Sequence, residues 1–281
     1  MRTAAERDIR VVKINGKKLF VDDSADGKQD LPTIFFMHGL GSNTSFWEAT
    51  IADSKLKEKY RLVRYDFDGH GLSPVSSLSA SDGAMLSLDD LVEDLVAVMD
   101  YAGVDKAAGI VGHSMSGLVA STFASRHPDR VDKLVLLGAM RALAPAIQTT
   151  MLQRASTVIA KGMSSVVQQV VSAALSDHTK QHSPLSAALV RTLVLTTPPG
   201  GYASACHALA GATDPDYSRI KLSGGVLVVS GEYDYMSNQE TTEFLEQKIP
   251  DAKKVVMKDV GHWHAVEQPL EVRKIFEEWF L

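Results

Sequence analysis

The strongest constraint on the fold is an alternation between short apolar runs and longer segments with helical periodicity. Largely apolar runs occur at 33–37, 60–66, 133–137 and 226–230, and a glycine follows each run within three residues. Strands that are apolar throughout are covered on both faces, as in parallel sheets flanked by helices. We therefore predict an α/β protein with a mostly parallel sheet, whose ligands sit at the carboxyl ends of the strands.

Other local patterns complete this outline. Apolar and polar residues alternate around Asn15-Gly16, which predicts a hairpin over 8–24. A capping box at Ser87 opens one of the predicted helices, and a further strand is expected at 254–257. Helical periodicity predicts helices over 45–59, 88–102, 115–126, 241–248 and 269–280.

The pattern changes between Arg141 and Asp216. This segment has no strand-like run, only helical periodicity punctuated by Pro184 and by Pro198-Pro199-Gly200-Gly201. We expect about four helices here, inserted into the strand–helix alternation. The predicted domains are therefore a core formed by 1–140 and 217–281, and an insertion formed by 141–216.

Composition narrows the classes of function. A net charge of −5 and a pI near 6.0 give no support for nucleic-acid binding, and no apolar run is long enough to span a membrane. The first eight residues lack the apolar stretch of a secretory signal. Cys206 is the single cysteine, which excludes an internal disulfide. We expect a cytoplasmic protein with neither a nucleic-acid nor a membrane partner.

A serine lies where a predicted strand at 106–111 turns into the helix at 115–126. The stretch reads Gly112-His113-Ser114-Met115-Ser116-Gly117, and its small residues let the chain pass through a sharp turn. A serine on such an elbow projects its hydroxyl beside a free N–H at the helix start. We interpret Ser114 as a nucleophile, although the pattern is G-x-S-x-S-G instead of the usual G-x-S-x-G.

A serine hydroxyl needs a base, and the base works best when a third group orients it. His262 comes directly after the last strand and a glycine, which makes it the expected base; His264 is the competitor. Asp234 follows the strand at 226–230 and is the expected orienting acid, whereas Glu232 comes too early in the turn.

Acyl transfer also needs N–H donors where an oxyanion develops. The elbow supplies the Met115 N–H, and the loop His38-Gly39-Leu40-Gly41 supplies a second donor, which we assign to Leu40. A phosphate-binding loop fits poorly, because no Lys-Ser or Lys-Thr follows these glycines.

Five segments in register resemble the α/β-hydrolase superfamily over nearly the whole chain. They are HGLGSNTSFW at 38–47, RYDFDGHGLS at 64–73, GHSMSG at 112–117, GEYD at 231–234 and GHWHAVEQP at 261–269. Their order, serine then acid then histidine, is the order of that fold. The resemblance implies an eight-stranded sheet, with 141–216 as a helical cap over the site.

A shorter resemblance concerns the subfamily. PPGGYASACHAL at 198–209 is similar to a segment of 3-oxoadipate enol-lactonases and related small lactone and ester hydrolases. Two residues depart from the family pattern: Ser116 replaces a glycine of the elbow, and Asp68 stands where members usually carry arginine. The change at Asp68 removes a positive charge, which cationic cap residues such as Arg141 or Arg191 could replace.

Together these features predict a serine hydrolase acting on a carboxylic ester or lactone of a small organic substrate. Two alternatives remain at this point: a carbon–carbon bond hydrolase using the same triad, and a hydrolase-derived receptor for a small molecule. Expected substrate contacts are His38, Gly39, Met140, Tyr202 and Trp263. The chain shows neither a metal-ligand spacing nor a dinucleotide fingerprint, so we expect no cofactor and no metal, and a monomer or homodimer.

Overall fold

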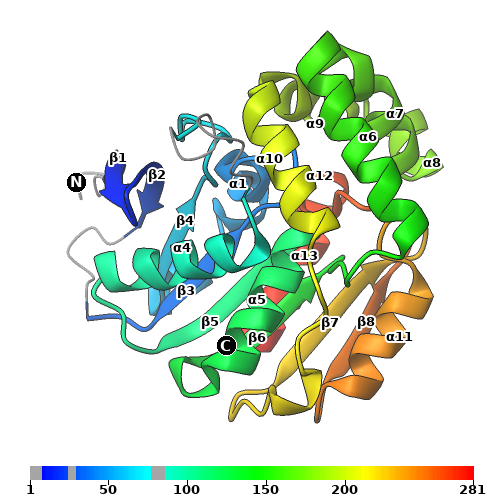
Figure 1. The fold of residues 1–281 in the computed structure, drawn as a ribbon. Coiled ribbons are helices and arrows are strands. Elements are labelled where there is room, and N and C mark those ends of the chain that lie inside the picture. The colour runs from blue at the N-terminus through cyan, green and yellow to red at the C-terminus, as the bar shows by residue number, and fades with distance from the viewer. Residues whose placement is uncertain (1–7, 25–29, 77–85) are drawn as a thin grey trace, which may run out of the picture.

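A computed structural model describes residues 8–24, 30–76 and 86–281. Within these ranges the chain forms an eight-stranded sheet (Figure 1). Its strands, in spatial order, are β1 (Asp8–Ile14), β2 (Lys17–Asp23), β4 (Arg61–Tyr65), β3 (Thr33–Met37), β5 (Ala107–His113), β6 (Val131–Leu137), β7 (Val226–Gly231) and β8 (Lys253–Met257). The predicted hairpin is confirmed, and the turn residues Asn15 and Gly16 both have positive φ angles, as the two-residue turn requires.

The six strands from β4 to β8 are parallel, while β1 and β2 add an antiparallel edge. The register aligns Met37 with Gly112, and His113 with Leu137, so the carboxyl ends of β3, β5 and β6 meet at one edge. The predicted mostly parallel α/β fold is confirmed.

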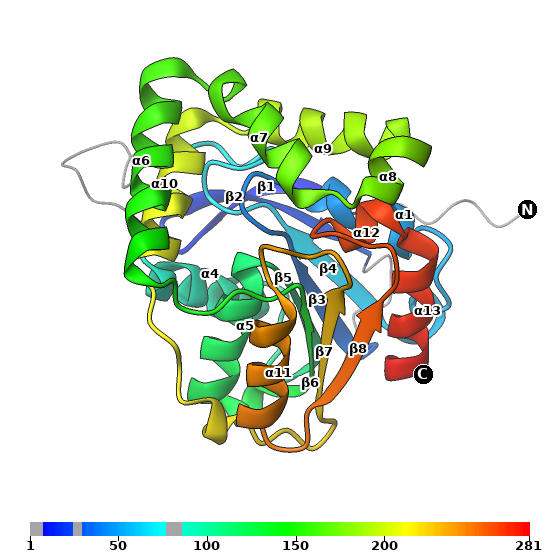
Figure 2. The same cartoon turned by 90° about the vertical axis from the view of Figure 1, so that its right-hand side faces the viewer.

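Helices cover both faces of the sheet. Figure 2 shows α4 (Leu88–Tyr101), α5 (Met115–Arg126) and α11 (Gln239–Lys248) on one face, with α1 (Glu48–Ile51) and α13 (Pro269–Phe280) on the other. The predicted capping box opens α4, where the Ser87 and Asp90 side chains each bond the other's backbone N–H. None of the helices in the described ranges is both long and apolar enough to cross a membrane.

The single helix predicted over 45–59 is wrong. The chain instead forms a 3-10 turn (Thr44–Trp47), α1, and a separate α2 (Leu56–Lys59). Glu277 of α13 accepts hydrogen bonds from the Ser54 hydroxyl at 2.9 Å and the Lys55 N–H at 2.8 Å, which stabilises the break. A partner more than 200 residues away leaves no trace in the local periodicity.

The segment between β6 and β7 forms a helical layer at the carboxyl edge of the sheet (Figures 1 and 2). Residues 145–210, all of them described, contain five helices instead of the expected four: α6 (Pro145–Lys161), α7 (Ser164–Ala174), α8 (Asp177–His182), α9 (Pro184–Thr196) and α10 (Pro199–Ala210). The extra helix, α8, has six residues, too few for a periodic signal. We call α6–α10 the cap helices; the division of the chain into core and cap domains stays a prediction.

Candidate active site

Ser114 occupies a sharp turn between β5 and α5. Its backbone has φ 57° and ψ −120°, a conformation that non-glycine residues adopt only when their surroundings enforce it. The Ser114 N–H donates to the Leu137 carbonyl, and the Ser114 carbonyl accepts from the Met140 N–H, both at 3.0 Å. A Cβ atom on Gly112 would lie 2.4 Å from the Ser116 carbonyl oxygen, so this position needs glycine. Backbone bonds and steric fit therefore hold the serine in place.

Ser116 has a structural partner at the position where the family pattern has glycine. Its side chain is fully buried, and its hydroxyl donates a hydrogen bond to the His38 carbonyl oxygen. The departure from the pattern thus links the serine elbow to the loop after β3.

Three of the predicted site residues form a continuous hydrogen-bonded series. The Ser114 hydroxyl lies 2.8 Å from His262 Nε2, and His262 Nδ1 lies 3.0 and 2.9 Å from the two carboxylate oxygens of Asp234. His262 and Asp234 follow β8 and β7, as the sequence predicts, and both are buried. An Nδ1–H that donates to Asp234 leaves the Nε2 lone pair facing the serine, which is the arrangement of a general base.

The surroundings of Asp234 keep its carboxylate ionised and able to accept hydrogen bonds. Burial alone would raise the pKa of its carboxyl group, but the charge and hydrogen bond of His262, with the Ser237 N–H, outweigh burial and lower that pKa below its ordinary value. Oδ1 also accepts from the Met236 N–H at 2.9 Å and the Ser237 N–H at 2.8 Å. The carboxylate is therefore charged and oriented toward His262.

Two further histidines fix the backbone of His262. His113 Nε2 and His264 Nδ1 lie 2.7 and 2.9 Å from the His262 carbonyl oxygen. Burial lowers the pKa of both imidazoles, so each stays neutral and donates one N–H to that oxygen. His264 is thus next to His262, with its other nitrogen 3.8 Å from Asp234, while His262 is the histidine that contacts Ser114.

The two predicted oxyanion donors belong to segments close to Ser114. Met115 is the first residue of α5, so its N–H has no partner within the helix. Leu40 lines the same cavity as Ser114. A Cβ on Gly39 would lie 3.0 Å from the Ser114 Cβ, and the Gly41 N–H donates to His70 Nε2 at 3.3 Å. The loop therefore passes close to Ser114, and the hydrogen bond to His70 holds it in place.

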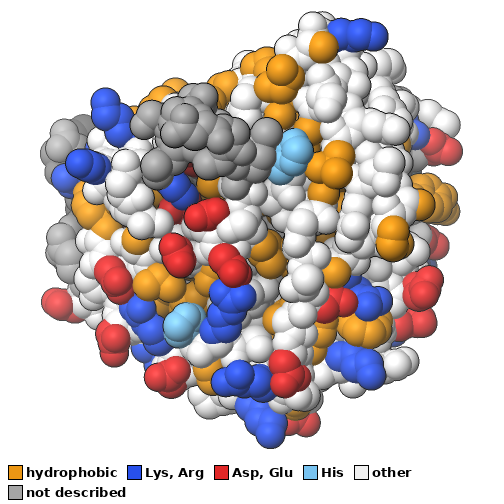
Figure 3. Space-filling model, viewed as in Figure 1, with side chains coloured by type: hydrophobic (Ala, Val, Ile, Leu, Met, Phe, Trp, Pro, Cys, Tyr) orange, Lys and Arg blue, Asp and Glu red, His pale blue; other side chains and the backbone are white. Residues whose placement is uncertain are grey.

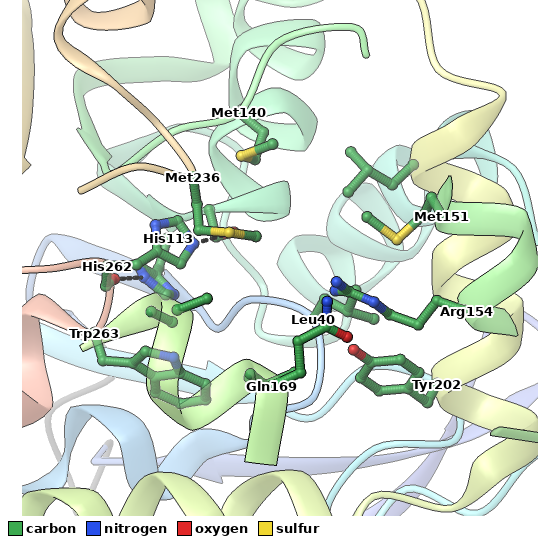
Figure 4. Close-up of a pocket in the computed structure, with 15 residues that line it drawn as sticks. Leu40, His113, Met140, Met151, Arg154, Gln169, Tyr202, Met236, His262 and Trp263 are labelled. Atoms are coloured by element: carbon green, nitrogen blue, oxygen red, sulfur yellow. Dashed lines mark hydrogen bonds between the residues drawn. The ribbon is translucent and has the colours of Figure 1, made fainter. Parts of the chain in front are cut away.

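Ser114 and His262 line a cavity of about 80 Å³. Figure 4 shows this cavity with His262 and Trp263 on one side and Arg154 and Tyr202 on the other. Three of the predicted substrate contacts, Met140, Tyr202 and Trp263, line it. The other two, His38 and Gly39, are not among its lining residues. The His38 side chain is fully buried, its Nδ1 bonds the Gly39 carbonyl at 2.8 Å, and its Nε2 accepts from the Phe67 N–H at 3.2 Å.

The cationic cap residue in this cavity is Arg154, which the sequence analysis missed. Arg141 pairs with Asp214 at 3.1 Å and stacks on Phe244, and Arg191 is exposed on α9. The periodicity of α6 gave a partial signal for Arg154. Met151, Ala155 and Val158 form the buried stripe of α6, and Arg154 lies at its border.

Asp68, the second departure from the family pattern, stays outside the cavity lining. It is buried and accepts from the Ser76 N–H at 2.8 Å and the Ser76 hydroxyl at 2.9 Å. Its carboxylate therefore anchors the loop after β4.

Glu267, in the short helix α12 (His264–Glu267), is a second residue that the sequence analysis missed. Its buried carboxylate accepts from the Gly261 and Trp263 N–H groups, which flank His262, both at 3.0 Å. On the cap side it accepts hydrogen bonds from the Ser176 N–H at 2.9 Å and from the Thr179 hydroxyl at 2.8 Å. One carboxylate thus joins the histidine loop to the cap helices.

Comparisons with known proteins bear on the family and the fold of this chain. The 3-oxoadipate enol-lactonase 1 of Acinetobacter baylyi is 29% identical, with 95% of each chain covered. The solved enol-lactonase of Burkholderia xenovorans LB400 superposes with a TM-score of 0.86 at 26% identity, covering 96% of this chain and 99% of that one. A thermophilic esterase of Thermogutta terrifontis shares the fold, with a TM-score of 0.84 at 24% identity and 98% of both chains covered. The family model of the alpha/beta hydrolase fold matches residues 32–269, so the chain belongs to the α/β-hydrolase family.

Proposed function

We propose that the protein is a serine hydrolase that cleaves a carboxylic ester or lactone of a small organic molecule through an acyl-enzyme. The observation that carries the proposal is the unbroken series Asp234–His262–Ser114 at the wall of a cavity. The enol-lactonase names of two full-length relatives support the ester or lactone bond as the target.

In the first half-reaction the Ser114 oxygen attacks the substrate carbonyl carbon, and its proton moves to His262 Nε2. The carbonyl electron pair becomes an oxyanion, which the Met115 and Leu40 N–H groups would stabilise. When the tetrahedral intermediate collapses, the carbon–oxygen bond to the alcohol breaks. The leaving oxygen then takes the proton from His262, and the acyl group stays on Ser114.

In the second half-reaction water replaces the alcohol. His262 accepts a proton from the water as its oxygen attacks the acyl carbon, and returns that proton to Ser114 as the acid leaves. Asp234 remains ionised throughout and stabilises the imidazolium that forms in each half-reaction, for which its lowered pKa is suited.

A panel of short p-nitrophenyl esters, γ- and δ-lactones and enol lactones tests this proposal. We expect the wild type to hydrolyse members of the panel, and Ser114→Ala to lose about 10⁴- to 10⁶-fold in kcat with an unchanged circular dichroism spectrum. Acid-quenched wild type should carry one acyl group on the peptide containing Ser114. Undiminished turnover by Ser114→Ala would refute the assignment.

We also propose a cytoplasmic location and a monomer or homodimer as the working form. Support for the location comes from the single cysteine of the chain, Cys206, because proteins of oxidising compartments are often stabilised by internal disulfides, which one cysteine cannot form. Cell fractionation and light scattering of the purified protein test the two statements.

A further inference from the structure

Arg154 is an unusual residue for the wall of the catalytic cavity. It projects from α6 one turn after Met151, and among the described residues that line the cavity it is accompanied by no Lys, Asp or Glu. Most of its neighbours in the lining are apolar, including Met151, Leu209 and Met236. A half-buried guanidinium in such a wall has lost part of its hydration, so an anion beside it is favourable.

The protein itself supplies no such anion within the described ranges. Arg61, Arg64 and Arg141 each form an ion pair with a carboxylate, whereas no carboxylate of the described residues pairs with Arg154. The cap helices around it are also poor in charge, because α7 and α10 contain neither acidic residues nor Lys or Arg. The positive charge of Arg154 is therefore left for a molecule that enters the cavity.

Two polar side chains accompany the guanidinium. Tyr202 lines the cavity together with Arg154, and burial raises the pKa of its phenol to about 12, so it keeps its proton. The protonated Tyr202 O–H is therefore able to donate a hydrogen bond. Figure 4 shows the polar ends of Arg154, Gln169 and Tyr202 turned toward one another, on the side of the cavity away from His262 and Trp263.

We propose that Arg154, Gln169 and Tyr202 form a subsite for a carboxylate carried by the substrate, at a distance from the ester or lactone bond that Ser114 attacks. The inference rests on the proposed function and narrows it to half-esters of dicarboxylic acids and lactones that bear a carboxylate. A guanidinium binds a carboxylate with two parallel hydrogen bonds, which fixes orientation as well as position. A single cation and a small cavity suit this singly charged group better than a phosphate dianion.

The carboxylate acts by placing the reactive carbonyl. When residues of α6, α7 and α10 hold the carboxylate end of the substrate, the ester or lactone end is confined near the Ser114 oxygen. The contact between the carboxylate and Arg154 therefore contributes to kcat/KM. A neutral substrate of the same length loses this contribution but keeps the triad. Removal of the guanidinium should therefore affect anionic substrates selectively.

Two esters that differ only in the remote charge test the proposal: mono-p-nitrophenyl adipate and p-nitrophenyl methyl adipate. We expect the wild type to prefer the acid, and Arg154→Met to lower kcat/KM for it by about 10- to 100-fold, mainly through KM, since a hydrogen-bonded charge is lost. The neutral ester should change by less than twofold. Arg154→Lys should restore part of the preference, and added salt should weaken it.

Arg191→Met is the matched control, because Arg191 is an exposed arginine of a cap helix outside the cavity lining. It should leave the kinetics of both esters unchanged. An equal loss for both esters in Arg154→Met, or a wild type that prefers the neutral ester, would overturn the subsite.

Calorimetry with adipate separates this proposal from the proposed function. Ser114→Ala should bind adipate, and Ser114→Ala/Arg154→Met should bind it at least tenfold more weakly. If the wild type hydrolyses neither these esters nor any member of the ester and lactone panel, the hydrolase proposal fails, yet adipate binding that depends on Arg154 still supports the subsite. Equal adipate binding by the two variants overturns the subsite whatever the turnover.

Discussion

The two sides of the catalytic cavity are built differently. The floor, by which we mean Ser114, Asp234, His262 and the loop after β3, sits on strand ends held by backbone hydrogen bonds. The roof, by which we mean the cap helices, relies on side-chain packing and carries few charges. Figure 3 shows charged side chains spread over the face below, around α4, α5 and α11, and few over α6 and α10. The comparison suggests that the floor determines the chemistry and the roof determines which substrates reach it.

After Ser114→Ala, the largest effect is expected on the floor, from Asp234→Asn. An amide favours the wrong tautomer of His262 and cannot stabilise the imidazolium, so kcat should fall by about 10⁴-fold, as replacement of a triad aspartate does in serine proteases. The rates for the acidic and the neutral p-nitrophenyl ester should fall by the same factor. If the rate fell for only one of the two esters, Asp234 would take part in substrate selection. The division between a floor that determines the chemistry and a roof that selects substrates would then be wrong.

The floor was also the part that the sequence predicted well. Strands such as 33–37, the elbow around Ser114 and the order of serine, acid and histidine all depend on short-range signals: apolar runs, glycines and strand exits. The parallel register then brings distant strand ends to one edge without further information. That is why the residues of the Asp234–His262–Ser114 series could be named before their contacts were known.

The roof was harder because its contacts are long-range. Helical periodicity shows which face of α6 is buried but not what lies across from it, so Arg154 was missed while Arg141 and Arg191 were named. Glu267 was hidden for the same reason, since its partners Ser176 and Thr179 lie about 90 residues earlier in the chain. Such a position has no local signature.

Glu267 connects the two sides, and Glu267→Ala should produce the next largest effect. The change leaves four buried donors without their acceptor, two in the histidine loop and two in the cap. With about 1–3 kcal/mol for each unsatisfied group and partial rescue by water, we expect a loss of about 3–5 kcal/mol in the free energy of unfolding. We also expect kcat to fall about 10- to 100-fold for both esters, because His262 is less well placed.

Urea unfolding and the kinetics of both esters measure the two effects of Glu267→Ala. Glu271→Ala is the control: this glutamate is exposed on α13, so its loss should change stability by less than about 0.5 kcal/mol. Glu267→Gln should recover part of kcat, since its amide oxygen can still accept from one side. If Glu267→Ala lowered stability but left kcat unchanged, Glu267 would stabilise the fold without positioning His262.

A pair of neighbouring glycines tests how closely the roof must dock on the floor. A Cβ on Gly201 would lie 1.9 Å from the Gly69 carbonyl oxygen, whereas a Cβ on Gly200 would meet only Val75, at 3.8 Å. Gly201→Ala should therefore displace α10, raise KM for both esters and cost about 1–3 kcal/mol of stability. Gly200→Ala should be neutral or stabilise the helix by up to about 1 kcal/mol. Equal thermal midpoints for the two variants would show that α10 tolerates displacement.

The smallest effect is expected from Ser116→Ala, on the floor itself. The change removes the hydrogen bond to the His38 carbonyl oxygen, which should cost about 1 kcal/mol in urea unfolding. That bond fixes the loop two residues before Leu40, so its loss should lower kcat a few-fold and equally for both esters if Leu40 donates to the oxyanion. Ser116→Gly, the residue of the family pattern, should show the same fall in kcat. If kcat fell in Ser116→Ala but not in Ser116→Gly, the alanine methyl group would be the cause instead of the lost hydrogen bond. The hydrogen bond to the His38 carbonyl oxygen would then give no support to Leu40 as an oxyanion donor.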